Sequence, residues 1–141
     1  MVRAAMRRVL VPGVLVLAAL SLSRVPAASA RLSANTVNTT ATVSDDGRKL
    51  VVNGPFTCTQ REWMDLRVTV TQRTTGAVAE GHARFEGSTS SQHWEVKIAA
   101  HGDASFEPGA ATVVAFATTS LDGDVTDAHQ WLVNVTLVEE E

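Results

Sequence analysis

The stretch that sets the structural class of this chain is Leu66-Arg67-Val68-Thr69-Val70-Thr71. Leucine and valine occupy one phase of the stretch, and arginine and threonine occupy the other. Successive side chains of an extended strand point to opposite faces of the sheet, so this alternation predicts a half-buried β-strand.

The same period of two recurs further along the chain, over residues 94–98 and 129–137. Threonine and valine make up 30 of the 111 residues after residue 30, and both types favour the pleated surface of a sheet. No window of a dozen residues shows a comparable period of 3.6. The chain is therefore expected to be all-β.

Turn-forming residues divide these runs at short intervals, and Ser44–Gly47 is the clearest hairpin signal because Gly accepts positive φ. The predicted strands cover residues 35–43, 49–53, 55–60, 65–73, 77–86, 92–99, 110–119 and 127–138. Seven to eight short antiparallel strands predict an immunoglobulin-like β-sandwich. A small closed barrel is the alternative.

The first thirty residues have the layout of a secretory signal peptide. A basic start is followed by the 14-residue apolar run Val9–Leu22 and by the small-residue site Ala28–Ala30. That run is shorter than the roughly 20 residues that span a bilayer. We expect residues 1–30 to be cleaved and residues 31–141 to form one secreted β-sandwich domain without a membrane anchor.

Charge is divided unevenly between these two parts. All 15 acidic residues lie after residue 30, where only 8 basic residues accompany them, so this part carries a net charge of −7. An acidic domain is a poor match for nucleic acid or for an anionic lipid surface. Neither is expected as a partner.

Three pieces of the sequence together resemble a known group of proteins: Gly54-Pro55-Phe56-Thr57-Cys58-Thr59 followed by Leu66–Gln72, His93-Trp94-Glu95-Val96, and Phe106-Glu107-Pro108-Gly109-Ala110-Ala111. They are similar to small secreted actinobacterial domains, immunoglobulin-like and mostly of unknown function. The resemblance implies a second Cys shortly before the middle-strand Trp, but residues 87–92 contain none. It supplies no catalytic residues.

Cys58 is the one cysteine of the chain, and the expected compartment is oxidising. An unpaired thiol there indicates a buried relic of a lost bridge, a covalent dimer or a reactive group. The buried relic is the favoured interpretation. We accordingly expect a monomer, with a covalent dimer through Cys58 as the alternative.

The polar residues include the types that build catalytic and metal sites. The G-x-S-x-G elbow of serine hydrolases is absent, so no catalytic residue and no cofactor is assigned. Imidazoles and clustered carboxylates are metal ligands, which makes His82, His93, His101 and His129, or Asp122, Asp124 and Asp127, candidates. Scattered solvated histidines and turn-forming aspartates explain the same residues, and no metal site is assigned.

The three tryptophans differ in their surroundings. Trp94 and Trp131 share a strand face with aliphatic residues and are predicted to be core, whereas Trp63 follows Arg61 and Glu62 in a polar segment. Capping of one end of the sandwich is the favoured interpretation of Trp63. If the domain has a binding surface, Arg61, Glu62 and Trp63 are the candidate partner contact. The sequence thus favours a secreted, non-enzymatic protein of extracellular binding or surface interaction. A carrier of an apolar small molecule in a cleft is the alternative, and a histidine-based metal protein is a weaker one.

Overall fold

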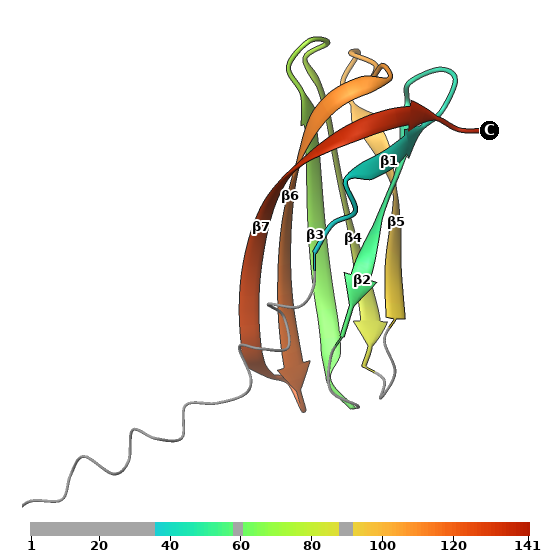
Figure 1. Cartoon of the computed structure of the whole chain (residues 1–141). Helices are drawn as coiled ribbons and strands as arrows, with labels where there is room; N and C mark the ends of the chain where they lie inside the picture. Colours follow the sequence, from blue (N-terminus) through green and yellow to red (C-terminus); the bar gives the residue numbers. More distant parts are fainter. Residues whose placement is uncertain (1–35, 58–60, 88–91) are drawn as a thin grey trace, which may run out of the picture.

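The structure, a computed structural model, describes residues 36–57, 61–87 and 92–141. Seven strands cover most of these residues (Figure 1): β1 (Thr40–Val43), β2 (Lys49–Phe56), β3 (Trp63–Gln72), β4 (Ala77–Glu86), β5 (Gln92–His101), β6 (Gly109–Leu121) and β7 (Asp124–Glu139). The all-β class is confirmed. The expected signal peptide and Cys58 lie outside the described residues.

The strands form one sheet in the order β1-β2-β5-β4-β3-β6-β7, and a parallel pairing of β1 with β7 closes it into a barrel. Every other pairing is antiparallel. The expected sandwich of two separate sheets is therefore replaced by its alternative, the closed barrel. The difference is the β1–β7 pairing, which joins residues almost one hundred positions apart and leaves no local signal in the sequence.

Two halves of the barrel are nevertheless distinct. β3 pairs with β4 and β6 along nearly all its length, and β2 pairs with β5 in the same way. In the described part of the chain, the backbone pairing that joins the halves is limited to two places. Val78–Ala79 pair with Ala100–His101, and β1 pairs with residues 136–139 of β7. Both joins lie at the same end of the molecule, the upper end in Figure 1. The barrel is thus closed at this end, which we call the closed end. At the other end, the open end, the two halves face each other like the sheets of a sandwich.

β2 runs without a break through Gly54 and Pro55, where the sequence predicted two strands. Asn53 accepts a hydrogen bond from the Asn38 N–H, so its backbone polar groups face away from β5. Pro55, two residues on, directs its nitrogen to that same side, where the ladder with β5 needs no donor. The proline is accommodated because of this phase.

The predicted hairpin at Ser44–Gly47 joins β1 to β2. The Gly47 N–H donates to the Ser44 carbonyl at 2.9 Å, and the Asp46 carboxylate accepts from the Ser44 hydroxyl at 2.7 Å and the Arg48 N–H at 3.0 Å. These bonds, that of Ser44 first, lower the pKa of Asp46 below its ordinary value. The turn is held by local polar contacts, as its residue types predict.

The core fills the inside of the barrel with the inward phase of each strand. It includes Trp94, predicted to be core, and Phe56, whose ring lies 5.4 Å from that of Phe85. Trp131 is half-buried and packs against the same cluster. Within the described residues there is no helix of the length and apolar character that a bilayer crossing requires.

Candidate functional site

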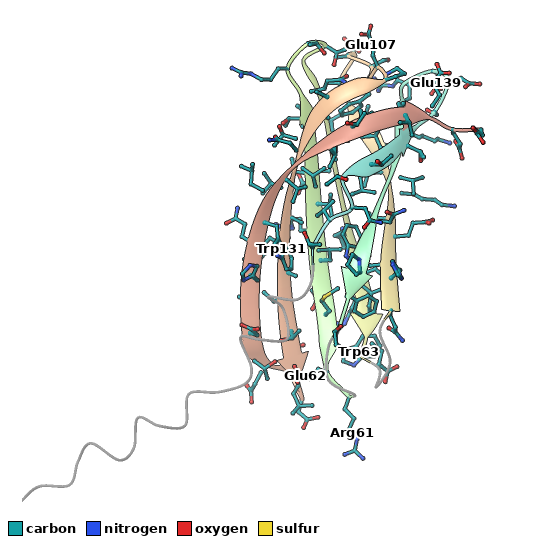
Figure 2. The ribbon with its side chains drawn as sticks, viewed as in Figure 1. Arg61, Glu62, Trp63, Glu107, Trp131 and Glu139 are labelled. Carbon is teal, nitrogen blue, oxygen red and sulfur yellow. The ribbon has the colours of Figure 1, made fainter. Side chains whose placement is uncertain are left out.

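The structure separates the three residues predicted to contact a partner (Figure 2). Arg61 is exposed and has a φ of 76°, and Trp63, at the start of β3, is 38% exposed. Glu62 lies between them and is only 3% exposed, because alternation along the chain turns it toward the barrel interior. Arg61 and Trp63 therefore reach the surface, and Glu62 does not.

Glu62 belongs to a buried polar cluster near the open end of the barrel. The Thr126 hydroxyl donates to its carboxylate at 2.7 Å and lies 2.8 Å from the hydroxyl of Thr119. Thr126 sits where a β-bulge shifts the register between β6 and β7. A bulge re-aims a side chain, and here it presents a hydroxyl to Glu62. The cluster ties β7 to the start of β3.

Trp63 lies on the outer face of the barrel beside a charged pair. The guanidinium carbon of Arg84 lies 4.8 Å from the centre of a Trp63 ring, and the Arg84 Nε lies 3.9 Å from an Asp65 carboxylate oxygen. Arg84 and Asp65 face each other across β3 and β4. A cation above an aromatic face is attracted by the ring quadrupole, so Arg84 fixes the exposed ring in place.

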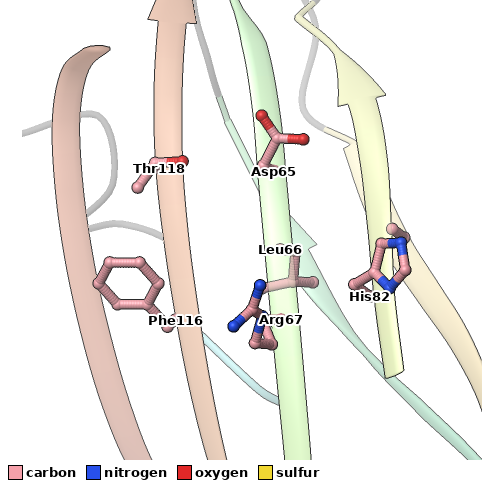
Figure 3. A pocket seen from close by; sticks show the side chains of 7 residues that line it. Asp65, Leu66, Arg67, His82, Phe116 and Thr118 are labelled. Atoms are coloured by element: carbon pink, nitrogen blue, oxygen red, sulfur yellow. The ribbon is translucent and has the colours of Figure 1, made fainter. Parts of the chain in front are cut away.

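The same outer face carries an exposed phenylalanine. Phe116 of β6 is 46% exposed and lies opposite Arg67 of β3, which in turn lies opposite His82 of β4. The next row places Thr118 of β6 opposite Asp65. These side chains line a surface hollow of about 400 Å³ (Figure 3). We call this region the Phe116 face: Asp65, Arg67, His82, Phe116 and Thr118.

The chemistry of the Phe116 face differs from that of the acidic domain as a whole. The outward residues of β6 from Thr112 to Ser120 are all uncharged. The neighbouring strand β3 presents Arg67 and Asp65, and Arg84 lies opposite Asp65 on β4. Aromatic and arginine side chains are enriched in protein interfaces, where they supply apolar area and directional hydrogen bonds. The Phe116 face suits a partner that packs on the Phe116 ring and accepts hydrogen bonds from the Arg67 guanidinium.

The remaining histidines and the aspartate loop do not converge. His93 and His101 are exposed on β5, and the ring of His129 lies 4.8 Å from that of Trp131. Asp122 and Asp124 are exposed, whereas Asp127 has one carboxylate oxygen that is buried and accepts no hydrogen bond. Over residues 36–57, 61–87 and 92–141, no three His, Cys, Asp or Glu side chains are grouped so that they could hold a metal ion.

Comparisons with known proteins give a distant structural likeness. No protein-family model matches the sequence, and no curated protein matches it. Among solved structures, the crystal structure of the E. coli chaperone DraB aligns with 73% of this chain at 13% sequence identity and a TM-score of 0.40. The chain distantly resembles DraB. It spans about half, 53%, of the DraB chain.

Of the five residues that define the Phe116 face, the sequence indicated only His82 as a candidate site residue, and it did not indicate Phe116 itself. β6 is apolar in both phases around it, so the strand reads as buried whichever face is inward. Its inward phase is set by Ala111, Val113, Ala115 and Ala117, all of them core. Side-chain size could have identified Phe116 as exposed, because the inward phase of β6 holds small residues and the single aromatic residue of the strand stands in the outward phase.

Proposed function

We propose that the chain is a secreted, non-enzymatic, immunoglobulin-like domain that binds an extracellular partner through the Phe116 face. Secretion rests on the leader-like residues 1–30, and the immunoglobulin-like description rests on the two distinct halves of the barrel. The binding role rests on the exposure of Phe116 beside Arg67. Because Trp63 lies on the same outer face, part of the predicted contact at residues 61–63 adjoins this surface.

One observation carries the proposal. Contact between an aromatic ring and water is unfavourable relative to burial of the ring, and the side chain of Phe116 is nearly half exposed. Single exposed apolar residues are common, but this one shares a surface hollow with the guanidinium of Arg67 and the imidazole of His82. A partner that covers Phe116 removes apolar area from water and strengthens any hydrogen bond to Arg67.

The Phe116 face favours binding over catalysis. His82, Asp65 and Thr118 all line it, but in the described structure no hydrogen bond joins any two of them. A hydroxyl nucleophile needs a base within hydrogen-bond reach. The proposal therefore assigns these residues to recognition and assigns no reaction.

The alternative, a carrier of an apolar small molecule, calls for an enclosed apolar cleft. The hollow at the Phe116 face is lined by two charged side chains and an imidazole as well as by Phe116. That mixture suits the surface of another macromolecule better than an apolar ligand. Partner binding and small-molecule carriage can be distinguished by the mass of the bound molecule, which is a protein in the first case and a small molecule in the second.

Site-specific cross-linking tests this proposal. We expect the full chain with the photo-reactive amino acid p-benzoylphenylalanine at position 116, expressed in the cells that produce the protein, to cross-link to one extracellular protein. Substitution Arg67→Ala in the same chain is expected to lower the yield about tenfold, because an interface arginine contributes on the order of 1–2 kcal/mol. Mass spectrometry of the adduct is the measurement.

The matched control places the same amino acid at Lys97, which is exposed on β5 in the other half of the barrel. Position 97 should give little of the adduct formed at position 116. Equal adducts at both positions, or none at position 116, would contradict the proposal. An adduct with the mass of a small molecule would favour the carrier instead.

A further inference from the structure

The long C-terminal strand has an edge that no described strand covers. β7 pairs with β6 along one side throughout, but on its other side it pairs with β1 only over residues 136–139. The uncovered edge therefore extends from Asp124 to Val135, and we call it the β7 edge. In Figure 1, β7 is the red-brown strand whose lower part borders the open end of the barrel.

The hydrogen-bonding groups on the β7 edge follow from the pairing with β1. The Thr136 N–H donates to the Thr39 carbonyl, so residue 136 directs its backbone groups to this side. Backbone direction alternates along a strand, so Ala128, Gln130, Leu132 and Asn134 direct their N–H and C=O groups to the same side. The Ala128 N–H already donates to the Asp127 carboxylate at 2.9 Å, so three donors and four acceptors stand in a row with the spacing that another strand matches.

The β7 edge lacks the features that usually prevent such pairing. Natural edges are protected by proline, lysine or very short length. Residues 125–135 contain no proline and no lysine, and their ionisable side chains are Asp127 and His129. The edge also carries the two most exposed large apolar residues of the described chain, Val125 at 67% and Leu132 at 71%. A row of unmet hydrogen-bonding groups with apolar flanks favours association.

We propose that the β7 edge pairs antiparallel with the β7 edge of a second copy, giving a two-fold symmetric dimer with a continuous sheet across the interface. The stretch Val125–Val135 of the β7 edge is centred on Gln130, so a two-fold axis there pairs this stretch with the same stretch of the second copy. The pairing supplies about four backbone hydrogen bonds without the Ala128 N–H of either copy, which donates to Asp127. The proposal does not rest on the function of the Phe116 face, and it replaces the monomer that the sequence predicts.

Charge and packing agree with a second copy as the occupant. In this register Asp127 lies opposite Val133 of the second copy and His129 lies opposite Trp131, so no two acids face each other. Leu132 lies opposite Ala128 of the second copy, which leaves room for the larger side chain. At the centre, Gln130 faces its own symmetry mate. Two neutral amides can hydrogen-bond there.

Sedimentation equilibrium of residues 31–141 tests the dimer. We expect a reversible monomer–dimer equilibrium with a dissociation constant on the order of micromolar, because the interface is small. Gln130→Lys and Gln130→Glu should each weaken association about tenfold or more, since like charges then meet at the axis. An equimolar mixture of the two variants should restore it. Thr71→Lys, exposed on β3 two strands away from β7, should leave it unchanged.

A second variant tests the backbone pairing itself. Leu132→Pro removes an N–H that faces the open edge and leaves the ladder to β6 intact, so we expect a folded monomer by circular dichroism. A wild-type monomer at several hundred micromolar would overturn the proposal. A dimer that reducing agent dissociates would assign association to Cys58. Slow hydrogen exchange of the residue 130 and 132 amides in a dilute monomer would show that the chain covers its own edge, which also overturns the proposal.

Discussion

Substitution Gln72→Glu is expected to lower the free energy of unfolding by about 3 kcal/mol at neutral pH. Gln72 ends β3 and is 2% exposed, although its side chain is polar. Its Nε2 donates to the carbonyls of Glu107 at 2.8 Å and Ala110 at 3.2 Å. Its Oε1 accepts from the Glu107 N–H at 2.9 Å and the Thr75 hydroxyl at 3.0 Å.

Every hydrogen-bonding position of this amide is thus matched to one kind of partner. A carboxylate keeps the two acceptor contacts but places an oxygen against the carbonyls of Glu107 and Ala110, which then lose their donor. Leaving buried polar groups unpaired costs about 1–3 kcal/mol, and a buried charge adds to this. The loop before β6 would lose its attachment to the end of β3.

Urea unfolding measures the loss, with Gln92→Glu as the control because Gln92 is only half-buried and makes no side-chain hydrogen bond in the described structure. The control should change stability by less than about 0.5 kcal/mol. Below pH 4 the introduced carboxyl can bind a proton and donate one bond, so the difference between Gln72→Glu and the parent should narrow. Equal losses in the two variants would show that Gln72 does not organise this end.

The period of two predicted most strands to within a few residues, because each strand buries one phase. β4 has its predicted bounds, 77–86. The errors in strand bounds and topology occur where pairing with residues distant in sequence determines the structure. Pro55 led to the prediction of a break between two strands. β2 continues through it, because the proline nitrogen lies on the side of the strand where the pairing with β5 needs no donor. β1 is shorter than predicted. Closure into a barrel depends on pairing between β1 and the last residues of β7, which no local pattern encodes.

The candidate site divides in the same way. The polar neighbours of Trp63 made it the candidate for an exposed aromatic, although capping of one end of the sandwich was the favoured interpretation. Its side chain is 38% exposed. Glu62 shares those neighbours, yet the strand phase that begins at β3 turns it inward. Arg67 was identified only as the polar phase of a strand, and its position opposite Phe116 follows from a register between β3 and β6 that joins residues about fifty positions apart. The alternation of side chains along one strand can be predicted from the local sequence, whereas the pairing register between two strands cannot.

Substitution Gly47→Ala is expected to lower the free energy of unfolding by about 3–4 kcal/mol, against about 1 kcal/mol for Gly76→Ala. The two glycines form a matched pair, because their φ angles are 69° and 73°. A Cβ at Gly76 meets no atom within 4 Å, whereas a Cβ at Gly47 would overlap the carbonyl oxygen of Phe106 and lie 3.0 Å from its nitrogen.

The comparison separates two physical effects of the same substitution. Both variants pay for a side chain at positive φ, and both gain equally from a less flexible unfolded chain. The remaining difference, about 2–3 kcal/mol, measures the close approach of the Ser44–Gly47 hairpin to the backbone of Phe106, which also donates its N–H to the Gly47 carbonyl at 2.9 Å. Thermal or urea unfolding of both variants gives this difference directly. If the two losses are equal, the hairpin can move away from Phe106 at no cost, and the contact does not hold the closed end of the barrel together.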